Sequence, residues 1–120
     1  MAKILIVDDE DIIRRALARI FTSEKHQVIE AADGEQAIAQ WREVQPDLVF
    51  LDVLMPGRTG VQVLEEMEGN IHCKVVLMSA YTGEYNLETA KALGAQYFIP
   101  KPFDDIQSLK SLVEEILDGE

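Results

Sequence analysis

The segment VFLDVLMPGRTG, residues 49–60, contains one carboxylate, Asp52, which follows an apolar run and precedes a Met-Pro-Gly sequence. A carboxylate at the end of a buried strand lowers stability unless its charge is paired, neutralised or bound to a metal ion. Polar residues also follow three other apolar runs: Asp8 and Asp9, Ser79, and Lys101. If the fold brings these groups together, they can bind a divalent cation and supply a nucleophile.

Five short runs rich in β-branched and other apolar residues predict five β-strands. Three of these runs are almost continuously apolar, which is typical of strands that are covered on both faces, as in a parallel sheet. The predicted strands are residues 3–7, 27–31, 47–51, 74–78 and 96–99.

Helical patterns separate the strands, because apolar residues recur there every three or four positions. The second helix begins at DGEQ, where Asp33 and Gln36 have the spacing of a capping box, and it ends before Pro46. The third begins at TGVQ, and Gly94 ends the fourth. The fifth carries its apolar residues at Ile106, Leu109, Val113 and Ile116.

The alternation of strands and helices predicts an α/β fold, a single doubly wound (βα)5 domain over residues 1–120. Right-handed crossovers place helices on both faces of such a sheet, and function gathers beyond the carboxyl ends of its strands. With a strand order of 2-1-3-4-5, the polar residues at the strand ends share one rim. We therefore expect Asp8, Asp9, Asp52, Ser79 and Lys101 to converge.

Composition excludes several classes of function. The formal net charge of −11 disfavours direct binding to nucleic acid or to anionic membranes. The single cysteine cannot form an internal disulfide, and no apolar leader or membrane-spanning stretch is evident. These features predict a cytoplasmic protein. No output domain is expected in this chain.

The combination of Asp8-Asp9, Asp52 before VLMPGRTG, Ser79-Ala80, and Lys101-Pro102-Phe103 resembles the response-regulator receiver domain. The resemblance covers the whole chain. It implies that Asp52 accepts a phosphoryl group from a sensor histidine kinase or a histidine phosphotransfer protein, and that Mg²⁺ is required.

The resemblance also implies a set of metal ligands and a switch. Asp9 would bind the metal directly, Asp8 would bind it through water, and Asp52 and the backbone carbonyl of Leu54 would complete the protein's ligands. Mg²⁺ prefers such hard oxygen ligands, and a cluster of carboxylates is tolerated when it binds a cation. Lys101 would neutralise charge on the phosphoryl group, Ser79 would donate a hydrogen bond to it, and Phe98 would respond by changing rotamer.

Two further implications concern the surroundings of the phosphoryl group. The Lys101–Pro102 bond would be cis. Leu54 and Tyr81 occupy the two positions best placed to orient a hydrolytic water, where fast-cycling relatives of the chemotaxis type resemble an amide and an acid. Because neither side chain here orients water well, we expect slow self-dephosphorylation and no other enzymatic activity.

A phosphohydrolase and a scaffold that is never phosphorylated are the two alternatives to the phosphorylatable switch. A Mg²⁺-dependent aspartyl-phosphate phosphohydrolase of the haloacid dehalogenase type would need an acid two residues after the nucleophile, and Leu54 stands there. A scaffold that is never phosphorylated would usually lack an acid or the lysine. A receiver domain would act on a downstream protein partner or an attached output domain, and a phosphorylation-dependent homodimer is compatible with it.

Overall fold

The computed structural model describes residues 2–80, 87–101 and 105–118. It contains a parallel five-stranded sheet, formed by Lys3–Val7 (β1), Gln27–Ala31 (β2), Leu48–Asp52 (β3), Lys74–Ser79 (β4) and Tyr97–Pro100 (β5). The strand order is β2-β1-β3-β4-β5, which confirms the predicted order. Three strands differ from the prediction: β3 and β5 each begin and end one residue later, and β4 ends one residue later. As a result, Asp52 is the last residue of its strand.

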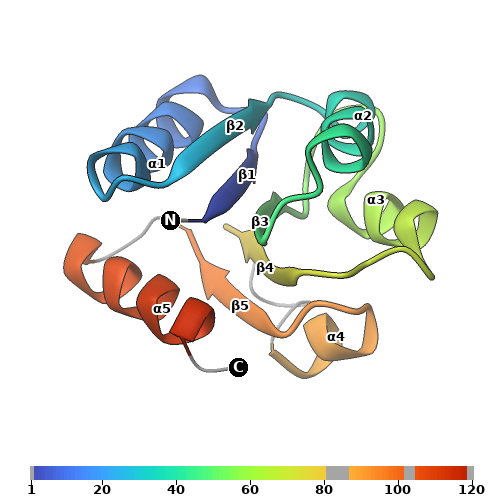
Figure 1. Cartoon of the computed structure of the whole chain (residues 1–120). Helices are drawn as coiled ribbons and strands as arrows, with labels where there is room; N and C mark the ends of the chain where they lie inside the picture. The colour runs from blue at the N-terminus through green and yellow to red at the C-terminus, as the bar shows by residue number, and fades with distance from the viewer. Residues whose placement is uncertain (1, 81–86, 102–104, 119–120) are drawn as a thin grey trace.

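Five helices cover the sheet: Asp11–Ser23 (α1), Gly34–Val44 (α2), Gly60–Met67 (α3), Leu87–Ala92 (α4) and Ile106–Asp118 (α5). As Figure 1 shows, α1 and α5 lie on one face, and α2, α3 and α4 lie on the other. This arrangement confirms the predicted doubly wound architecture. Within the described ranges, no helix is long and apolar enough to cross a membrane.

The three central strands are apolar on both faces because each face packs against helices. Alternate residues of one strand therefore enter different cores. On β1, Leu5 and Val7 join the core beneath α2 and α3, whereas Ile4 and Ile6 join the core beneath α1 and α5. In the latter core the rings of Phe21 and Phe50 stack with centroids 5.4 Å apart.

Two helix starts are fixed by side-chain caps. At α2, the Asp33 side chain accepts a hydrogen bond from the backbone N–H of Gln36. In a complete capping box the Gln36 side chain would accept a hydrogen bond from the backbone N–H of Asp33. Here Gln36 Oε1 accepts instead from the N–H of Ala32, one residue earlier. The complete capping box is found at α3, where the Thr59 and Gln62 side chains each accept from the other's backbone. This box fixes the end of the loop that follows Asp52.

Gly60, the first residue of α3, lies against the backbone of the strand that ends in Asp52. Its N–H donates to the carbonyl oxygen of Val53 at 2.8 Å. A Cβ atom at this position would collide with the carbonyl oxygen of Asp52. Because that neighbour is backbone and not the end of a flexible side chain, it cannot move aside without shifting Asp52.

We predict that Gly60→Ala lowers the free energy of unfolding by about 1–2 kcal/mol, because overpacking outweighs the higher helix propensity of alanine. Urea unfolding followed by the fluorescence of Trp41, the only tryptophan, would measure the change. Glu65→Ala, at an exposed position of the same helix, is the control and should change stability by less than about 0.5 kcal/mol. Unchanged stability of Gly60→Ala would contradict the prediction.

Candidate functional site

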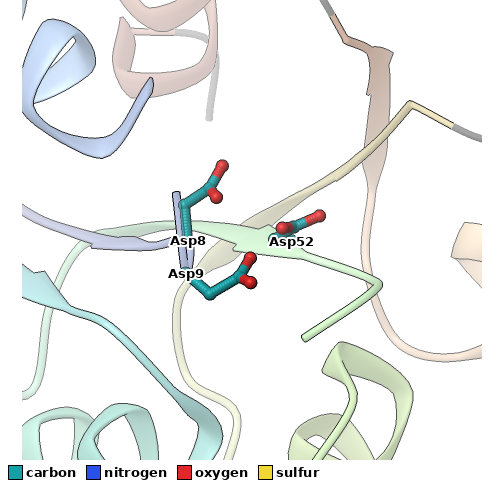
Figure 2. Close-up of side chains that lie close together, drawn as sticks. All are labelled: Asp8, Asp9 and Asp52. Carbon is teal, nitrogen blue, oxygen red and sulfur yellow. The ribbon is translucent and has the colours of Figure 1, made fainter. Parts of the chain in front are cut away.

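Three carboxylates meet at the carboxyl ends of β1 and β3. The ladder pairs Val7 with Leu51, so that Asp8 and Asp52 follow directly on neighbouring strands. Together with Asp9 they form a cluster in which one oxygen atom from each residue lies within 4.8 Å of the other two. Figure 2 shows the three side chains projecting from these two strand ends. The structure thus confirms that these acids converge.

Asp8 is fully buried, and each of its polar groups has a partner. Its N–H donates to the carbonyl oxygen of Ala31 at 3.1 Å. Its Oδ1 accepts from the backbone N–H of Glu10 at 2.9 Å, and its Oδ2 accepts from Lys101 Nζ at 2.9 Å. Its carbonyl oxygen accepts from Arg14 Nη1 at 2.8 Å. Asp8 is therefore held in one orientation.

Lys101 is the ammonium group of the site. Besides its bond to Asp8, its Nζ donates to Asp52 Oδ2 and to Glu10 Oε1, both at 3.2 Å. Burial opposes the charged form of Lys101. The hydrogen bond to Asp8 and the charges of Asp52 and Asp8 outweigh this effect, so the pKa of Lys101 lies above its ordinary value. The ammonium remains charged and shares its protons among three carboxylates.

Glu10 was not predicted as part of this site. It does occupy the N-cap position of α1, but its side chain makes no capping hydrogen bond. Its carboxylate binds Lys101 instead. The signal that could have revealed this role is the run of four acids, Asp8 to Asp11, which exceeds what one helix cap requires.

The surroundings of Asp52 disfavour its charged form. The residue is only 2% exposed. Burial, followed by the negative charge of Asp8, raises the pKa of Asp52 to about 7, although Lys101 acts in the opposite direction. Asp9 adds a smaller repulsion. One ammonium group is therefore not enough to balance the cluster.

Ser79 lies on β4, the neighbour of β3, and Phe98 lies on β5, the next strand along the sheet. Ser79 is fully buried at the end of β4. The N–H of Lys101 donates to its carbonyl oxygen at 2.9 Å, which ties the end of β5 to the end of β4. Phe98 pairs with Leu77 in the ladder and packs, partly buried, against the core beneath α2 and α3. The predictions on Tyr81 and Pro102 lie outside the described residues.

The loop between β3 and α3 carries Leu54, a residue that is 53% exposed, whereas Met55 is buried. Arg58 attaches this loop to the adjacent helices. Its Nε lies 2.7 Å from Glu35 Oε2 on α2, and its Nη1 lies 3.2 Å from Glu66 Oε1 on α3. These are exposed ion pairs, which contribute little to stability, but they join the loop to both helices.

The donor set of the cluster fits a hard divalent cation. Within the described part of the chain, the exposed carboxylate of Asp9 makes no hydrogen bond, so it is available as a ligand. Buried carboxylates close to one another favour a cation, and carboxylate oxygens are the ligands that Mg²⁺ prefers. A thiol or imidazole ligand is absent from the cluster, which disfavours softer metals.

Comparisons with known proteins agree with this geometry. Residues 4–114 match the profile of the response regulator receiver domain. The chain is 38% identical over 116 residues to sporulation initiation phosphotransferase F of Bacillus subtilis, covering 96% of this chain and 93% of that protein. It is 36% identical over 105 residues to the transcriptional regulatory protein CpxR of Klebsiella pneumoniae, covering 88% of this chain but only 45% of the regulator.

Solved structures show the same fold. The chemotaxis protein CheY4 of Vibrio cholerae superposes with a TM-score of 0.87 at 27% identity, covering 97% of this chain and 98% of that one. A CheY-like receiver domain from Methanospirillum hungatei has a TM-score of 0.90 at 26% identity, covering 99% and 95%. The chain therefore belongs to the response regulator receiver domains of two-component signalling.

Proposed function

We propose that this chain is a phosphorylatable switch in which Asp52 accepts a phosphoryl group from a sensor histidine kinase or a histidine phosphotransfer protein. The observation that carries the proposal is the buried Asp52 carboxylate, 3.2 Å from Lys101 Nζ and clustered with Asp8 and Asp9. A nucleophile beside a fixed ammonium and an acidic cation site has what phosphoryl transfer requires, namely positioning and charge neutralisation.

Asp8, Asp9, Asp52 and the backbone carbonyl of Leu54 would hold Mg²⁺. When bound, the ion would offset the mutual repulsion of the carboxylates and the negative charge of the incoming phosphoryl group. Lys101 contributes the other positive charge. Because Glu10 and Asp8 also bind the Lys101 ammonium, it stays at the pocket when Asp52 becomes an acyl phosphate.

In the transfer step, an ionised carboxylate oxygen of Asp52 attacks phosphorus. An oxygen–phosphorus bond forms while the phosphorus–nitrogen bond to the donor histidine breaks, and the electron pair leaves with the imidazole nitrogen. The pKa of Asp52 is raised even with Lys101 beside it, so a bound cation would favour the ionised form before the attack. Lys101 then donates a hydrogen bond to a phosphoryl oxygen.

Ser79 and Phe98 would carry the signal away from the pocket. The Ser79 hydroxyl donates to the phosphoryl group, and this new contact exists in only one of the two states. A contact of that kind shifts the population of conformations. Because Lys101, which directly follows β5, is bonded through its backbone to Ser79, and Phe98 lies on β5 three residues before Lys101, β5 is positioned to respond.

The output would be a protein partner or an attached output domain, in the cytoplasm. The chain spans nearly all of the sporulation phosphotransferase but less than half of the transcriptional regulators, so both arrangements occur among its relatives. The net charge of −11 supports protein partners over nucleic acid or anionic lipid. A phosphohydrolase of the haloacid dehalogenase type would need an acid two residues after Asp52, and that position is Leu54, which argues against this function. The complete set of acids and lysine speaks against a silent scaffold.

The central prediction is that Asp52 is the phosphorylation site. With Mg²⁺ and a small phosphodonor such as acetyl phosphate, the protein should gain one phosphoryl group, and Asp52→Asn should gain none. Intact-mass spectrometry would measure both. Asp118→Asn, at an exposed acid at the end of α5, is the control and should be labelled like the wild type. Equal labelling of Asp52→Asn would refute the assignment.

A second prediction follows from the raised pKa of Asp52, in protein stripped of metal by a chelator. Unfolded Asp52 ionises near pH 4, whereas the folded pKa is about 7. Between these values the native state holds a proton that the unfolded chain has lost, so stability falls as pH rises from about 4 to 7 and then levels off.

Asp52→Asn removes the ionisable carboxyl group and therefore removes this fall of stability with rising pH. We expect it to raise the free energy of unfolding by about 1–2 kcal/mol at pH 8 and by much less at pH 4, because Lys101 keeps its bonds to Asp8 and Glu10. Urea titrations at the two pH values would test this, again with Asp118→Asn as the control. A variant that is less stable than the wild type at pH 8 would show that Lys101 outweighs the repulsion.

A third prediction concerns the lifetime of the phosphorylated state. The Leu54→Asn, Tyr81→Glu double variant should lose its phosphoryl group about tenfold faster or more, because the new amide and acid can orient a water. Tenfold corresponds to about 1.4 kcal/mol of barrier. Phosphate release after removal of the donor would measure the rates, and Leu54→Met, which keeps an apolar side chain, should match the wild type. If the double variant is no faster, these side chains do not control the water.

A further inference from the structure

Arg14 is, with Lys101, one of two buried cations in the described part of the chain, and the metal ligands and switch residues proposed above do not include it. It lies on α1, and 7% of the residue is exposed. Its guanidinium makes three contacts from three different nitrogen atoms. Nη1 donates to the carbonyl oxygen of Asp8 at 2.8 Å, Nε to Glu30 Oε1 at 3.0 Å, and Nη2 to Asp11 Oδ1 at 2.6 Å.

These contacts join three elements at one point. Glu30 belongs to β2, Asp11 begins α1, and Asp8 follows the end of β1. The guanidinium is planar and rigid, so binding Glu30 and Asp11 fixes the direction in which its third nitrogen meets Asp8. A buried charge of this kind is seldom the most stabilising choice, because a well-packed apolar side chain often serves as well. The advantage that it offers here is geometric.

The geometry in question is that of the peptide between Asp8 and Asp9. The carbonyl oxygen that accepts the hydrogen bond from Arg14 belongs to this peptide. The hydrogen bond therefore fixes the orientation of the peptide plane that leads into Asp9. The Asp9 carboxylate itself has no hydrogen bond within the described ranges to steer it. Its direction therefore depends on the backbone. Three residues, all acidic, connect β1 to α1, and their mutual repulsion would otherwise spread them apart.

We infer that Arg14 is a positioning residue for the divalent-cation site, holding the Asp8–Asp9 peptide so that both carboxylates face the ion before it binds. The inference rests on the proposed function, because it takes the acid cluster to bind Mg²⁺. Arg14 acts through the Asp8 carbonyl and does not touch the ion. Residues that orient metal ligands in this way typically contribute about 10–100-fold to metal affinity.

Charge and positioning make opposite predictions for the loss of Arg14. As a positive charge near the acids, Arg14 repels a cation, so its removal by charge alone would tighten Mg²⁺ binding. As a positioning residue, its removal would weaken binding. Arg15, the next residue, is exposed on the same helix and carries the same charge. It is a matched control for the charge effect.

The experiment measures the Mg²⁺ dissociation constant by isothermal titration calorimetry, with circular dichroism to show that each variant is folded at the temperature used. Arg14→Gln should bind Mg²⁺ about tenfold more weakly or worse. Arg14→Lys, which keeps the charge but not the planar fork, should recover part of the loss. Arg15→Gln should bind as tightly as the wild type or slightly more tightly.

A further control separates positioning from stability. Ala18→Gly should destabilise α1 without touching Asp8, because Ala18 lies in the core beneath α1 and α5. Its Mg²⁺ affinity should equal that of the wild type. If Arg14→Gln does not fold, Arg14→Lys carries the test, and we expect binding several-fold weaker than that of the wild type.

The outcomes distinguish this inference from the proposed function. Wild-type protein that binds Mg²⁺, together with Arg14 variants that bind it equally or more tightly, would overturn the role of Arg14 and leave the metal site intact. Weakened binding in Ala18→Gly as severe as in Arg14→Gln would show a general effect of stability and would also overturn it. A wild-type protein that binds no Mg²⁺ would refute the metal site and the inference with it.

Discussion

The structure of the site depends on one ammonium group placed between two buried carboxylates. Lys101 binds Asp8 and Asp52, which lie 93 and 49 residues away in the sequence. Without this cation, the two buried and adjacent carboxylates of Asp8 and Asp52 could not both be ionised. The parallel sheet makes the pairing available, because it brings the ends of β1, β3 and β5 to one rim. The apolar strands and their helices position this one contact.

The same contact leaves the site able to respond to a ligand. Asp8, Asp52 and Glu10 share a single ammonium, and burial, followed by the negative charge of Asp8, still raises the pKa of Asp52. Any ligand that changes how Lys101 divides its hydrogen bonds also acts on β5, since the backbone of Lys101 is bonded to Ser79. An incompletely neutralised pocket joined to a strand end is a suitable origin for a conformational switch.

The features of the fold that depend on local pattern could be predicted from the sequence. Runs that are almost continuously apolar predicted strands covered on both faces, and the polar residues that follow them predicted a cluster at the carboxyl ends of the strands. The shifted ends of β3, β4 and β5 could not be predicted, because a strand ends where its neighbour stops pairing. Gln36 was assigned the right kind of contact but bonds Ala32 instead, since the choice between adjacent N–H groups depends on the entry angle of the chain.

The ionic partners of the site were the least predictable feature, and Arg14 shows why. In the sequence it is one of several charged residues on an amphipathic helix, three positions before the buried Leu17. Only the docking of α1 beside β2 brings Glu30 to it, and only the short connection from β1 brings the Asp8 carbonyl. Arg14 and Lys101 thus hold Asp8 from two sides, one at its backbone and the other at its carboxylate. Because the connection has so few residues, fixing both ends of Asp8 also restricts Asp9, whose own side chain stays available to bind a cation.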